Sequence, residues 1–383
     1  MPSREAVIAG VAESDLGETG LSLLALHTQA ATRALADAGL TLADVDGLAT
    51  NGVGRFPTTQ LAEYLGVHPR WTDSSFAGGS VLTGYVGKAA EAIRAGLADV
   101  VLVSWVSNQR SARARRLGGV VVDPSLPDAR LEAPYHPLSP MSMYAMAARR
   151  HMHEFGTTPE QLAAVAVEAR RWALMNPKAY RYGAGPLSID DVLASPMVSS
   201  PLHVADCCLV TDGGGAVVLV GSDRVADLPG RAVRVLGHGE ATTHSSMSQV
   251  PSLTTTGAAD SGRRAFAAAG LRPADVDVAQ VYDSFTATVL LSLEALGFCG
   301  PGESGPFVGE GNTGPGGSLP MNTSGGGLSY CHPGQVGLLL VVEAVRQLRG
   351  ECGERQVDGA QVALCHGTGG ILSHHATLIL GLA

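Results

Sequence analysis

Cysteine is scarce in this chain and absent from its first half. All six cysteines fall between Cys207 and Cys365, no CxxC pair occurs, and Cys207 and Cys208 are adjacent. This spacing excludes the usual zinc-ligand patterns and the dense disulfide framework of small secreted proteins. We therefore expect no metal and no bound cofactor in this chain, and a reducing, cytoplasmic location.

Positive charge and long apolar runs are also in short supply. The 26 Lys and Arg residues are outnumbered by 35 Asp and Glu residues, which gives a formal net charge of −9. Such a chain has no global basic surface for nucleic acid or acidic lipid. No uninterrupted apolar stretch reaches the roughly 18–20 residues of a membrane helix. The N-terminus lacks the apolar region and cleavage site of a signal peptide, so we expect no membrane insertion.

Glycine, by contrast, is abundant at 49 residues, and it marks an internal repeat. Residues 33–46 (RALADAGLTLADVD) align with residues 264–277 (RAFAAAGLRPADVD) at a constant offset. Each copy predicts a helix that ends at a glycine, followed by a short loop and a strand. A second pair of segments, 86–96 and 336–346, predicts a helix that leads to another strand.

Strands that alternate with helices indicate an α/β fold, with mixed or parallel sheets covered on both faces. The repeat predicts two pseudo-equivalent halves, residues 1–225 and 226–383, and the first half carries an insertion at about residues 106–200. The glycine loops Gly78-Gly79-Ser80 and Gly325–Gly334 each precede a helix. Because backbone N–H groups at helix starts stabilise anionic oxygen, we expect an oxyanion site where the halves meet.

Several motifs resemble the thiolase superfamily, and within it the sterol-carrier-protein-x and lipid-transfer-protein branch. The motifs are HMHEFGTTPEQLA (151–163), PLHVADCC (201–208), TDGGGA (211–216), LPMNTSGG (319–326), GGGLSYCHPG (325–334) and CHGTGG (365–370). The resemblance covers nearly the whole chain. It implies a thiolase-like fold with a loop and helical insertion over the active site, and a homodimer.

The departures from the thiolase pattern carry the functional argument. Phe76 matches the position of the acyl-accepting cysteine, and Ser74 and Ser75 lie one or two residues away. Tyr282 replaces the asparagine of the oxyanion hole, and Tyr330 precedes the loop that contains His332. This combination is similar to the steroid side-chain-cleaving aldolases, which cleave a β-hydroxyacyl-CoA to a ketone and a short acyl-CoA without an acyl-enzyme.

Such a retro-aldol reaction needs a base for the hydroxyl proton, donors for the enolate oxygen and an acid for the α-carbon. Tyr282 and Tyr330 are the candidates for proton transfer, although a tyrosine base requires a pKa lowered from about 10. His332 is a candidate donor to the enolate, and Asp283 a candidate for orienting a tyrosine or a histidine. Cys365, the retained second thiolase cysteine, is either the acid or an inert buried thiol.

Further residues are expected at the substrate or CoA. These are Phe76, Gly78, Gly79, Ser80, Gly326, His366 and Gly367, together with Arg113 and Arg116 for the CoA phosphates. The arginines could instead belong to a solvated loop or contact an acidic partner. The adjacent His374 and His375 are expected at the surface or an interface, and Cys207 and Cys208 in the core.

Three functions are compatible with these residues. The first is the CoA-dependent retro-aldolase, a carbon–carbon lyase. The second is a thiolase-like acyltransferase that uses Ser74, Ser75 or Cys365. The third is a non-catalytic subunit that binds acyl-CoA or sterol. The resemblance to the aldolases also implies a small partner protein with a zinc ribbon and an OB fold, in a heterotetramer.

Overall fold

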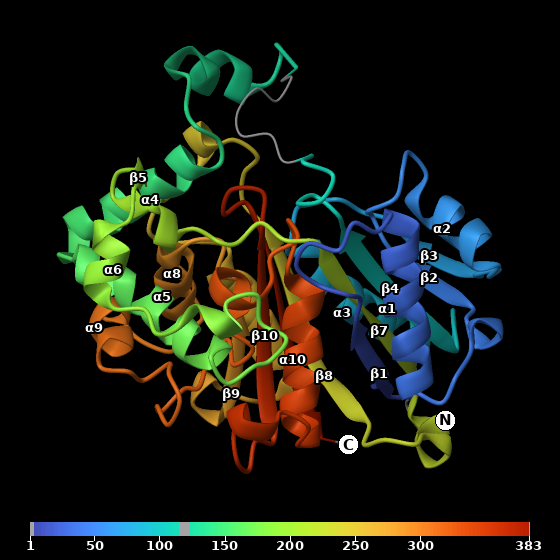
Figure 1. Cartoon of the computed structure of the whole chain (residues 1–383). Helices are drawn as coiled ribbons and strands as arrows, with labels where there is room; N and C mark the ends of the chain where they lie inside the picture. The colour runs from blue at the N-terminus through green and yellow to red at the C-terminus, as the bar shows by residue number, and fades with distance from the viewer. Residues whose placement is uncertain (1–3, 115–122, 383) are drawn as a thin grey trace.

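A computed structural model describes residues 4–114 and 123–382. Its central sheet has nine strands in the order β3-β2-β4-β7-β1-β8-β11-β10-β9 (Figure 1). They are β1 (Ala6–Glu13), β2 (Gly47–Ala49), β3 (Trp71–Asp73), β4 (Val100–Ser107), β7 (Gly213–Gly221), β8 (Val233–Thr242), β9 (Val278–Val281), β10 (Val362–Gly369) and β11 (His374–Leu382). β2 pairs in parallel with β3 and β4, as β9 does with β10, and the other pairs are antiparallel. The predicted α/β class is confirmed.

The two halves of the sheet are related by the repeat. β1, β2, β4 and β7 of the first half correspond in order to β8, β9, β10 and β11 of the second. The halves meet edge to edge, where Val7 of β1 pairs with Arg234 of β8 and Ile8 pairs with Val233. The predicted boundary at residues 225/226 falls in the connection η6 (Ser222–Asp227) that leads to β8, and it stays a prediction.

The same helix-on-strand contact occurs in both halves and explains two glycines. α1 (Leu23–Asp37) lies against β1, and α7 (Ala258–Ala269) lies against β8. A side chain at Gly10 would overlap the carbonyl oxygen of Ala34, and one at Gly237 would overlap that of Ala265. Each helix therefore packs directly on a strand backbone. After each helix, a short 3-10 turn, η1 (Leu42–Asp44) or η8 (Pro273–Asp275), leads to β2 or β9.

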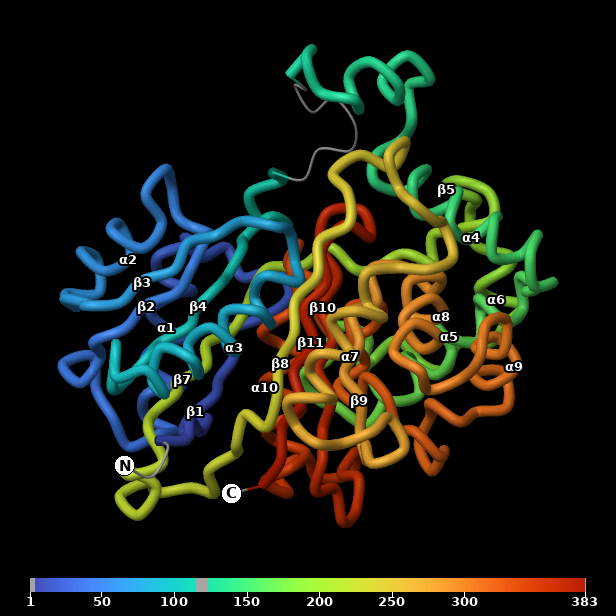
Figure 2. Tube along the Cα trace, turned by 180° about the vertical axis from the view of Figure 1, so that it is seen from behind, coloured from blue at the N-terminus to red at the C-terminus, as the bar shows by residue number. Residues whose placement is uncertain are grey.

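Two helices, α3 (Val81–Arg94) and α10 (Gly337–Arg349), form the central layer of the molecule. Their apolar side chains share one core cluster with residues of β1, β4, β7, β10 and β11. α1 and α2 (Pro57–Leu65) pack outside the first half, whereas α7 and α8 (Thr286–Ala295) pack outside the second (Figures 1 and 2). α3 and α10 touch near their starts, where a side chain at Gly337 would come 2.7 Å from the carbonyl oxygen of Gly79.

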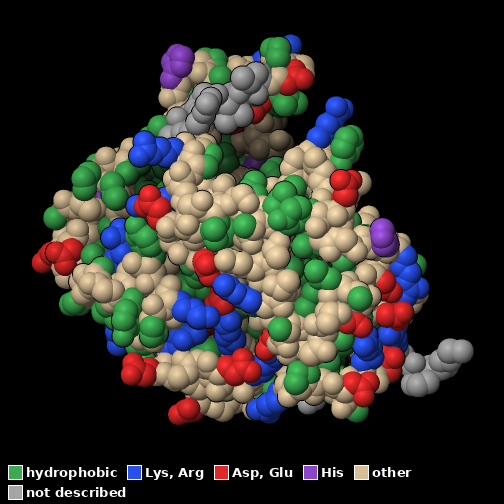
Figure 3. All heavy atoms as spheres, turned by 45° about the vertical axis from the view of Figure 1, so that its right-hand side comes forward, with side chains coloured by type: hydrophobic (Ala, Val, Ile, Leu, Met, Phe, Trp, Pro, Cys, Tyr) green, Lys and Arg blue, Asp and Glu red, His purple; other side chains and the backbone are tan. Residues whose placement is uncertain are grey.

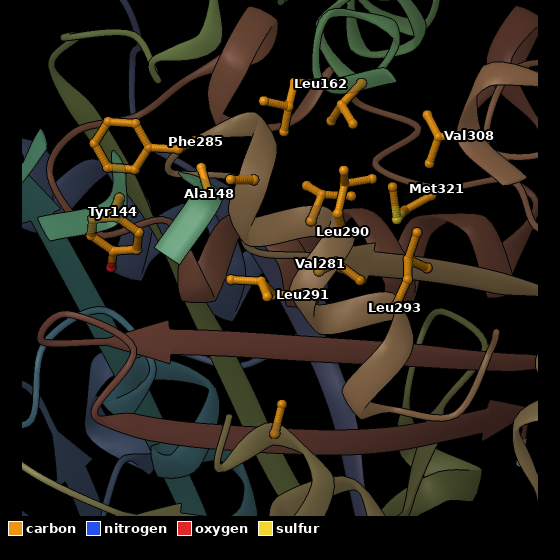
Figure 4. Packing of buried hydrophobic residues seen from close by; sticks show 14 of the residues in the cluster. Tyr144, Ala148, Leu162, Val281, Phe285, Leu290, Leu291, Leu293, Val308 and Met321 are labelled. Atoms are coloured by element: carbon orange, nitrogen blue, oxygen red, sulfur yellow. The ribbon is translucent and has the colours of Figure 1, made fainter. Parts of the chain in front are cut away.

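Between β4 and β7 the chain forms a mainly helical segment. Its elements are η2 (Asp128–Glu132), η3 (Ala133–Tyr135), α4 (Met141–Phe155), α5 (Pro159–Ala173), η4 (Tyr182–Ala184), α6 (Ile189–Ala194), β5 (Met197–Ser199), β6 (Leu202–His203) and η5 (Val204–Asp206). Tyr144 and Ala148 of α4 and Leu162 of α5 share a core with Phe285 and the leucines of α8 (Figure 4). The part that carries η2 and η3 stands away from the body in Figures 1 and 2.

The remaining elements of the second half are short except for α10. They are η7 (Met247–Gln249), α9 (Ser304–Gly309), η9 (Gly326–Tyr330) and η10 (Gly353–Arg355). On the face drawn in Figure 3, acidic and basic side chains lie among one another and among apolar ones. Within residues 4–114 and 123–382, no helix combines the length and the apolar character needed to cross a membrane.

Candidate active site

A pocket of about 650 Å³ opens where loops from both halves meet α4. The backbone of Gly78, Gly79, Gly369 and Gly370 lines part of it. Side chains from several separate segments line it: Phe76, Gln109, Pro140, Tyr144, Cys208, Thr242, His244, Ser245, Tyr282, Ser284, Phe285, His332, Gln335, Thr368, Ser373 and His374. The predicted meeting of the two halves at one site is thus observed in the structure.

Two of the glycines are required by close packing. Gly78 has a left-handed backbone with φ of 76°, and a side chain there would overlap the backbone of Gly370. A Cβ atom at Gly79 would lie 2.6–2.9 Å from the ring and hydroxyl oxygen of Tyr282. These distances are shorter than van der Waals contact, so Gly79 lets the tyrosine lie directly on the loop that precedes α3.

Tyr282 and His332 form a buried hydrogen-bonded pair. The Tyr282 hydroxyl lies 3.0 Å from His332 Nε2, and the two rings meet edge to face with centroids 5.6 Å apart. Burial raises the pKa of Tyr282 well above its ordinary value. This direction is opposite to the lowered pKa that a tyrosinate base requires, so Tyr282 is a neutral phenol whose hydroxyl contacts the histidine and, at 3.4 Å, the Gly334 carbonyl oxygen.

Asp283 follows Tyr282 in the chain but does not reach the pocket. Its carboxylate accepts hydrogen bonds from the backbone N–H groups of Gly327 (2.7 Å) and Leu328 (3.1 Å). Burial raises its pKa to about 6, and these N–H groups act against the rise. A side chain at Gly326 would overlap the carboxylate. Asp283 and Gly326 therefore hold the loop that leads to His332 rather than contact a ligand.

Tyr330 lies outside the pocket, contrary to the expectation of two tyrosines at one site. Its hydroxyl donates to the Glu13 carboxylate at 2.9 Å, and that carboxylate also pairs with Arg346 and Lys178. Burial and Glu13 raise the pKa of Tyr330. Burial alone would raise the pKa of Glu13, but Arg346 and Lys178 lower it to about 2. The buried carboxylate needs these donors, which explains the direction of the Tyr330 side chain.

Cys365, His366 and Gly367 lie along β10, away from the pocket. The Cys365 thiol is fully buried against the Leu340 carbonyl oxygen of α10, and burial raises its pKa. It precedes Thr368, the first β10 residue that lines the pocket, by three positions, or about 10 Å of strand. His366 is directed to the other face, where it meets Thr377 and His375. Gly367 packs against Ser80 and Thr83 of the α3 start.

The other predicted binding residues differ in exposure. Phe76 lines the pocket and is 73% exposed, whereas Ser80 is fully buried beside it. Arg113 is exposed, four residues after the pocket residue Gln109. Arg116 lies outside the described residues. Ser74 and Ser75 are exposed and do not line the pocket.

Three pocket side chains escaped the sequence analysis because no motif marks them as functional. Tyr144 donates to the Gly370 carbonyl oxygen at 3.2 Å, and burial raises its pKa to about 12. Cys208 lines the pocket, although it was expected in the core. His374 was expected at the surface or an interface; it is 8% exposed in this chain and contacts Ser80 and Glu240. Cys208 lies within the motif 201–208, whereas Tyr144 and His374 lie outside the motifs that resemble the family.

An apolar groove of about 570 Å³ lies beside the pocket. Both cavities use residues of the segments 137–146 and 242–248. The groove is lined mainly by Leu131, Tyr135, Pro137, Met143, Met146, Met247, Val250, Pro251 and Leu253, with Glu132, Arg150 and Glu154 among its polar residues. No cluster of three or more His, Cys, Asp or Glu residues able to hold a metal occurs in the part of the chain that the structure describes.

Known proteins give a consistent comparison. The thiolase C-terminal domain-like family model matches residues 239–382. The steroid side-chain-cleaving aldolase of Thermomonospora curvata is 36% identical and aligns over 95% of both chains. The 17-hydroxy-3-oxo-4-pregnene-20-carboxyl-CoA lyase of Mycobacterium tuberculosis is also 36% identical, over 96% of this chain and 98% of that one. A solved Ltp2-ChsH2(DUF35) aldolase chain is similar with a TM-score of 0.90 and 34% identity, covering 99% of this chain and 98% of that chain.

The packing of Gly79 on Tyr282 yields a stability prediction. Gly79→Ala forces the ring or the loop to move, so we expect the free energy of unfolding to fall by about 1–3 kcal/mol. Urea denaturation measures the free energy of unfolding. Gly183→Ala is the control, because a Cβ atom at that position meets nothing within 4 Å. In the double variant with Tyr282→Ala the two losses should not add, since the residues are in contact. Strict additivity would contradict the contact.

The Glu13 carboxylate yields a prediction about pH. Glu13→Gln leaves the buried Arg346 without its charge partner, so we expect a loss of about 3 kcal/mol at neutral pH. Because the folded-state pKa is about 2, below the ordinary 4.5, the wild-type advantage is present above pH 4.5 and declines as pH falls toward 2. Denaturation at about pH 7 and about pH 3.5 checks this, with the exposed Glu354→Gln as control. If the free energies of unfolding of wild type and Glu13→Gln differ by the same amount at both pH values, the account is contradicted.

Proposed function

The chain belongs to the thiolase superfamily, in the branch that includes the steroid side-chain-cleaving aldolases, and we propose that it is a retro-aldolase acting on CoA thioesters. In this proposal it cleaves a β-hydroxyacyl-CoA to a ketone and a short acyl-CoA. The observation that carries the proposal is the Tyr282–His332 pair, which lines a pocket where Phe76 stands in place of the thiolase nucleophile.

The proton chemistry of this pair suits the alcohol of the substrate. Tyr282 is a neutral phenol in contact with His332 Nε2. The phenol oxygen accepts the hydroxyl proton of the substrate while its own proton passes to the imidazole, so no tyrosinate is required. The electrons of the O–H bond then form the ketone, and those of the broken C–C bond form the thioester enolate. General base catalysis of this kind typically contributes about 100- to 10,000-fold.

The enolate oxygen requires hydrogen-bond donors. The backbone at Gly78, Gly79 and Ser80 lies at the start of α3, a helix of 14 residues whose N-terminal end carries partial positive charge. Placing the thioester oxygen here leaves its α-carbon and β-hydroxyl directed toward Tyr282, which lies on Gly79. One such donor is typically worth roughly 3–4 kcal/mol of barrier.

The acyltransferase alternative has less support from the geometry. Ser74, Ser75 and Cys365 do not line the pocket, and burial raises the pKa of the Cys365 thiol. Cys208 does line it. Intact-mass measurement after incubation with acyl-CoA separates the two functions, because the retro-aldolase forms no acyl-enzyme. An adduct on Cys208 would favour acyl transfer.

We assign the acyl skeleton to the steroid or another large apolar class. The relatives that support this are a steroid side-chain-cleaving aldolase and a pregnene-carboxyl-CoA lyase. The apolar groove beside the pocket supplies a surface of the right character, with Leu131, Tyr135 and Met146 exposed. We assign the CoA phosphates to the exposed Arg113 and, with it, to Arg116.

The quaternary structure is proposed on the same basis. The similar solved chain belongs to an Ltp2-ChsH2(DUF35) aldolase. We infer that this chain forms a homodimer that binds a small partner with a zinc ribbon and an OB fold, which gives a heterotetramer. Exposed apolar side chains near the pocket, such as Tyr135 at 84%, Leu131 and Leu138, are available for such contacts.

Tyr282→Phe tests the proposed reaction. The variant keeps the ring on Gly79 but removes the hydroxyl, so we expect cleavage of a tertiary β-hydroxyacyl-CoA to slow by about 100- to 10,000-fold. Mass spectrometry of the ketone and acyl-CoA products measures the cleavage rate. The small partner is co-expressed where cleavage requires that protein. Tyr64→Phe, at an exposed position in α2, is the matched control. Full activity of Tyr282→Phe would remove Tyr282 from the mechanism.

A further inference from the structure

The apolar groove beside the reaction pocket is charged at one end, and the proposed reaction gives that end no role. One wall of the groove is a stripe of α4 side chains at spacings of three and four residues: Met143, Met146, Arg150 and Glu154. Residues at these spacings lie on one face of a helix. The wall therefore changes along the helix axis from two methionines to a guanidinium and a carboxylate.

The same helix relates the charged end to the reaction pocket. Tyr144, the neighbour of Met143, lines the reaction pocket and donates to the Gly370 carbonyl oxygen. Arg150 lies six residues further along α4, which corresponds to about 9 Å of helix. A fused tetracyclic skeleton has a similar length. A skeleton that leaves the pocket past Tyr144 and follows α4 therefore ends beside Arg150.

The opposite wall is the loop that follows β8. Its apolar contribution comes from Met247, Val250, Pro251 and Leu253. The N–H group of Ser248 donates to Glu132 Oε1 at 2.7 Å, which joins this loop to the segment that carries η2 and η3. The Thr254 hydroxyl donates to Glu154 Oε2 at 2.8 Å, which joins the loop to α4 at the charged end. Both bonds hold the walls of the groove together.

The hydrogen bonds at the charged end leave donors available rather than acceptors. Arg150 Nε donates to Glu154 Oε1 at 2.6 Å, and Thr254 occupies the second carboxylate oxygen. The hydrogen bonds from Thr254 and Arg150 lower the pKa of Glu154, so this carboxylate is ionised at neutral pH. Within residues 4–114 and 123–382, neither terminal amino group of Arg150 donates a hydrogen bond to a protein atom.

This arrangement selects the chemistry of the ligand's far end. A hydrocarbon end would displace water from the Arg150 donors without replacing its hydrogen bonds, which is unfavourable. An acceptor oxygen replaces them. The charged side chains that line the groove are two carboxylates, Glu132 and Glu154, and one guanidinium. A carboxylate on the ligand would therefore be repelled, whereas a neutral carbonyl oxygen meets the donors without adding negative charge.

We propose that Arg150 is a specificity-determining residue that donates a hydrogen bond to a neutral carbonyl oxygen at the end of the acyl skeleton remote from the thioester. The inference rests on the proposed retro-aldolase function and adds a chemical feature to its substrate. Because this contact is remote from the bond that breaks, it stabilises the ground state and the transition state equally. Its loss should therefore raise KM and leave kcat nearly unchanged.

Two tertiary β-hydroxyacyl-CoAs test the assignment, with the small partner chain present where cleavage requires it. Their fused-ring skeletons are identical except for a carbonyl or a methylene group at the remote end. Wild-type kcat/KM should favour the carbonyl substrate by about 10- to 100-fold. Arg150→Met keeps an apolar stem without donors, so the preference should disappear through a higher KM for the carbonyl substrate. The methylene substrate should change by less than about threefold.

Arg149→Met is the matched control. Arg149 is the adjacent residue of α4, and it is exposed and does not line the groove, so its loss should leave the preference unchanged. Equal wild-type kcat/KM for the two substrates would overturn the assignment. An equal loss on both substrates in Arg150→Met would also overturn it, because that result indicates a structural role.

Calorimetric binding of the two ketones that cleavage would release gives a readout without turnover. Wild type should bind the ketone with the additional ring carbonyl about 10- to 100-fold more tightly than the other, and Arg150→Met should bind both equally. Equal wild-type affinities would overturn the role of Arg150. Wild-type protein that shows the difference in affinity but cleaves neither CoA thioester would support Arg150 and contradict the proposed function.

Discussion

The site depends on backbone meeting backbone without intervening side chains. Gly78 touches the backbone of Gly370, Gly369 leaves room for Ser80, and Gly79 supports the ring of Tyr282. A single Cβ atom at any of these positions would separate loops that come from opposite halves of a duplicated fold. Because protein interiors are close-packed and yield little, this constraint fixes the start of α3, Tyr282 and His374 relative to one another.

Buried carboxylates hold the surrounding loops in two different ways. Asp283 accepts hydrogen bonds from backbone N–H groups and from the Asn322 side chain, and burial raises its pKa to about 6. Glu13 is equally buried, but Arg346 and Lys178 lower its pKa to about 2. Asp283 thus fixes the loop that carries His332, and Glu13 ties the end of β1 to α10. Neither carboxylate needs to touch a substrate to determine where the reactive groups lie.

The fold could be predicted from the sequence because short-range sequence patterns mark the elements of the repeat. The shared AGL and ADVD residues predict a helix, a turn and a strand in each half, and α1, α7, η1 and η8 follow that pattern. The join of the halves through β1 and β8 was not predictable, since strand-edge pairing depends on residues far apart in the chain. The insertion also left no periodic signal that would place Tyr144 against Phe285.

The site was predictable in its loops but less so in its side chains. Motif positions identified Tyr282, His332, Gly78 and Gly79, which all line the pocket. A motif does not state which way a side chain points: Tyr330 and His366 lie outside the pocket, and Cys365 is a buried thiol, the alternative to a catalytic acid. His374 and Cys208 were expected elsewhere because burial and pairing depend on tertiary contacts.

The central claim is that carbon–carbon cleavage conserves the thioester and needs no second thiol. The direct measurement is cleavage of a tertiary β-hydroxyacyl-CoA with and without added free CoA. The account predicts equal rates, whereas cleavage that occurs only when free CoA is supplied would contradict it and indicate thiolysis.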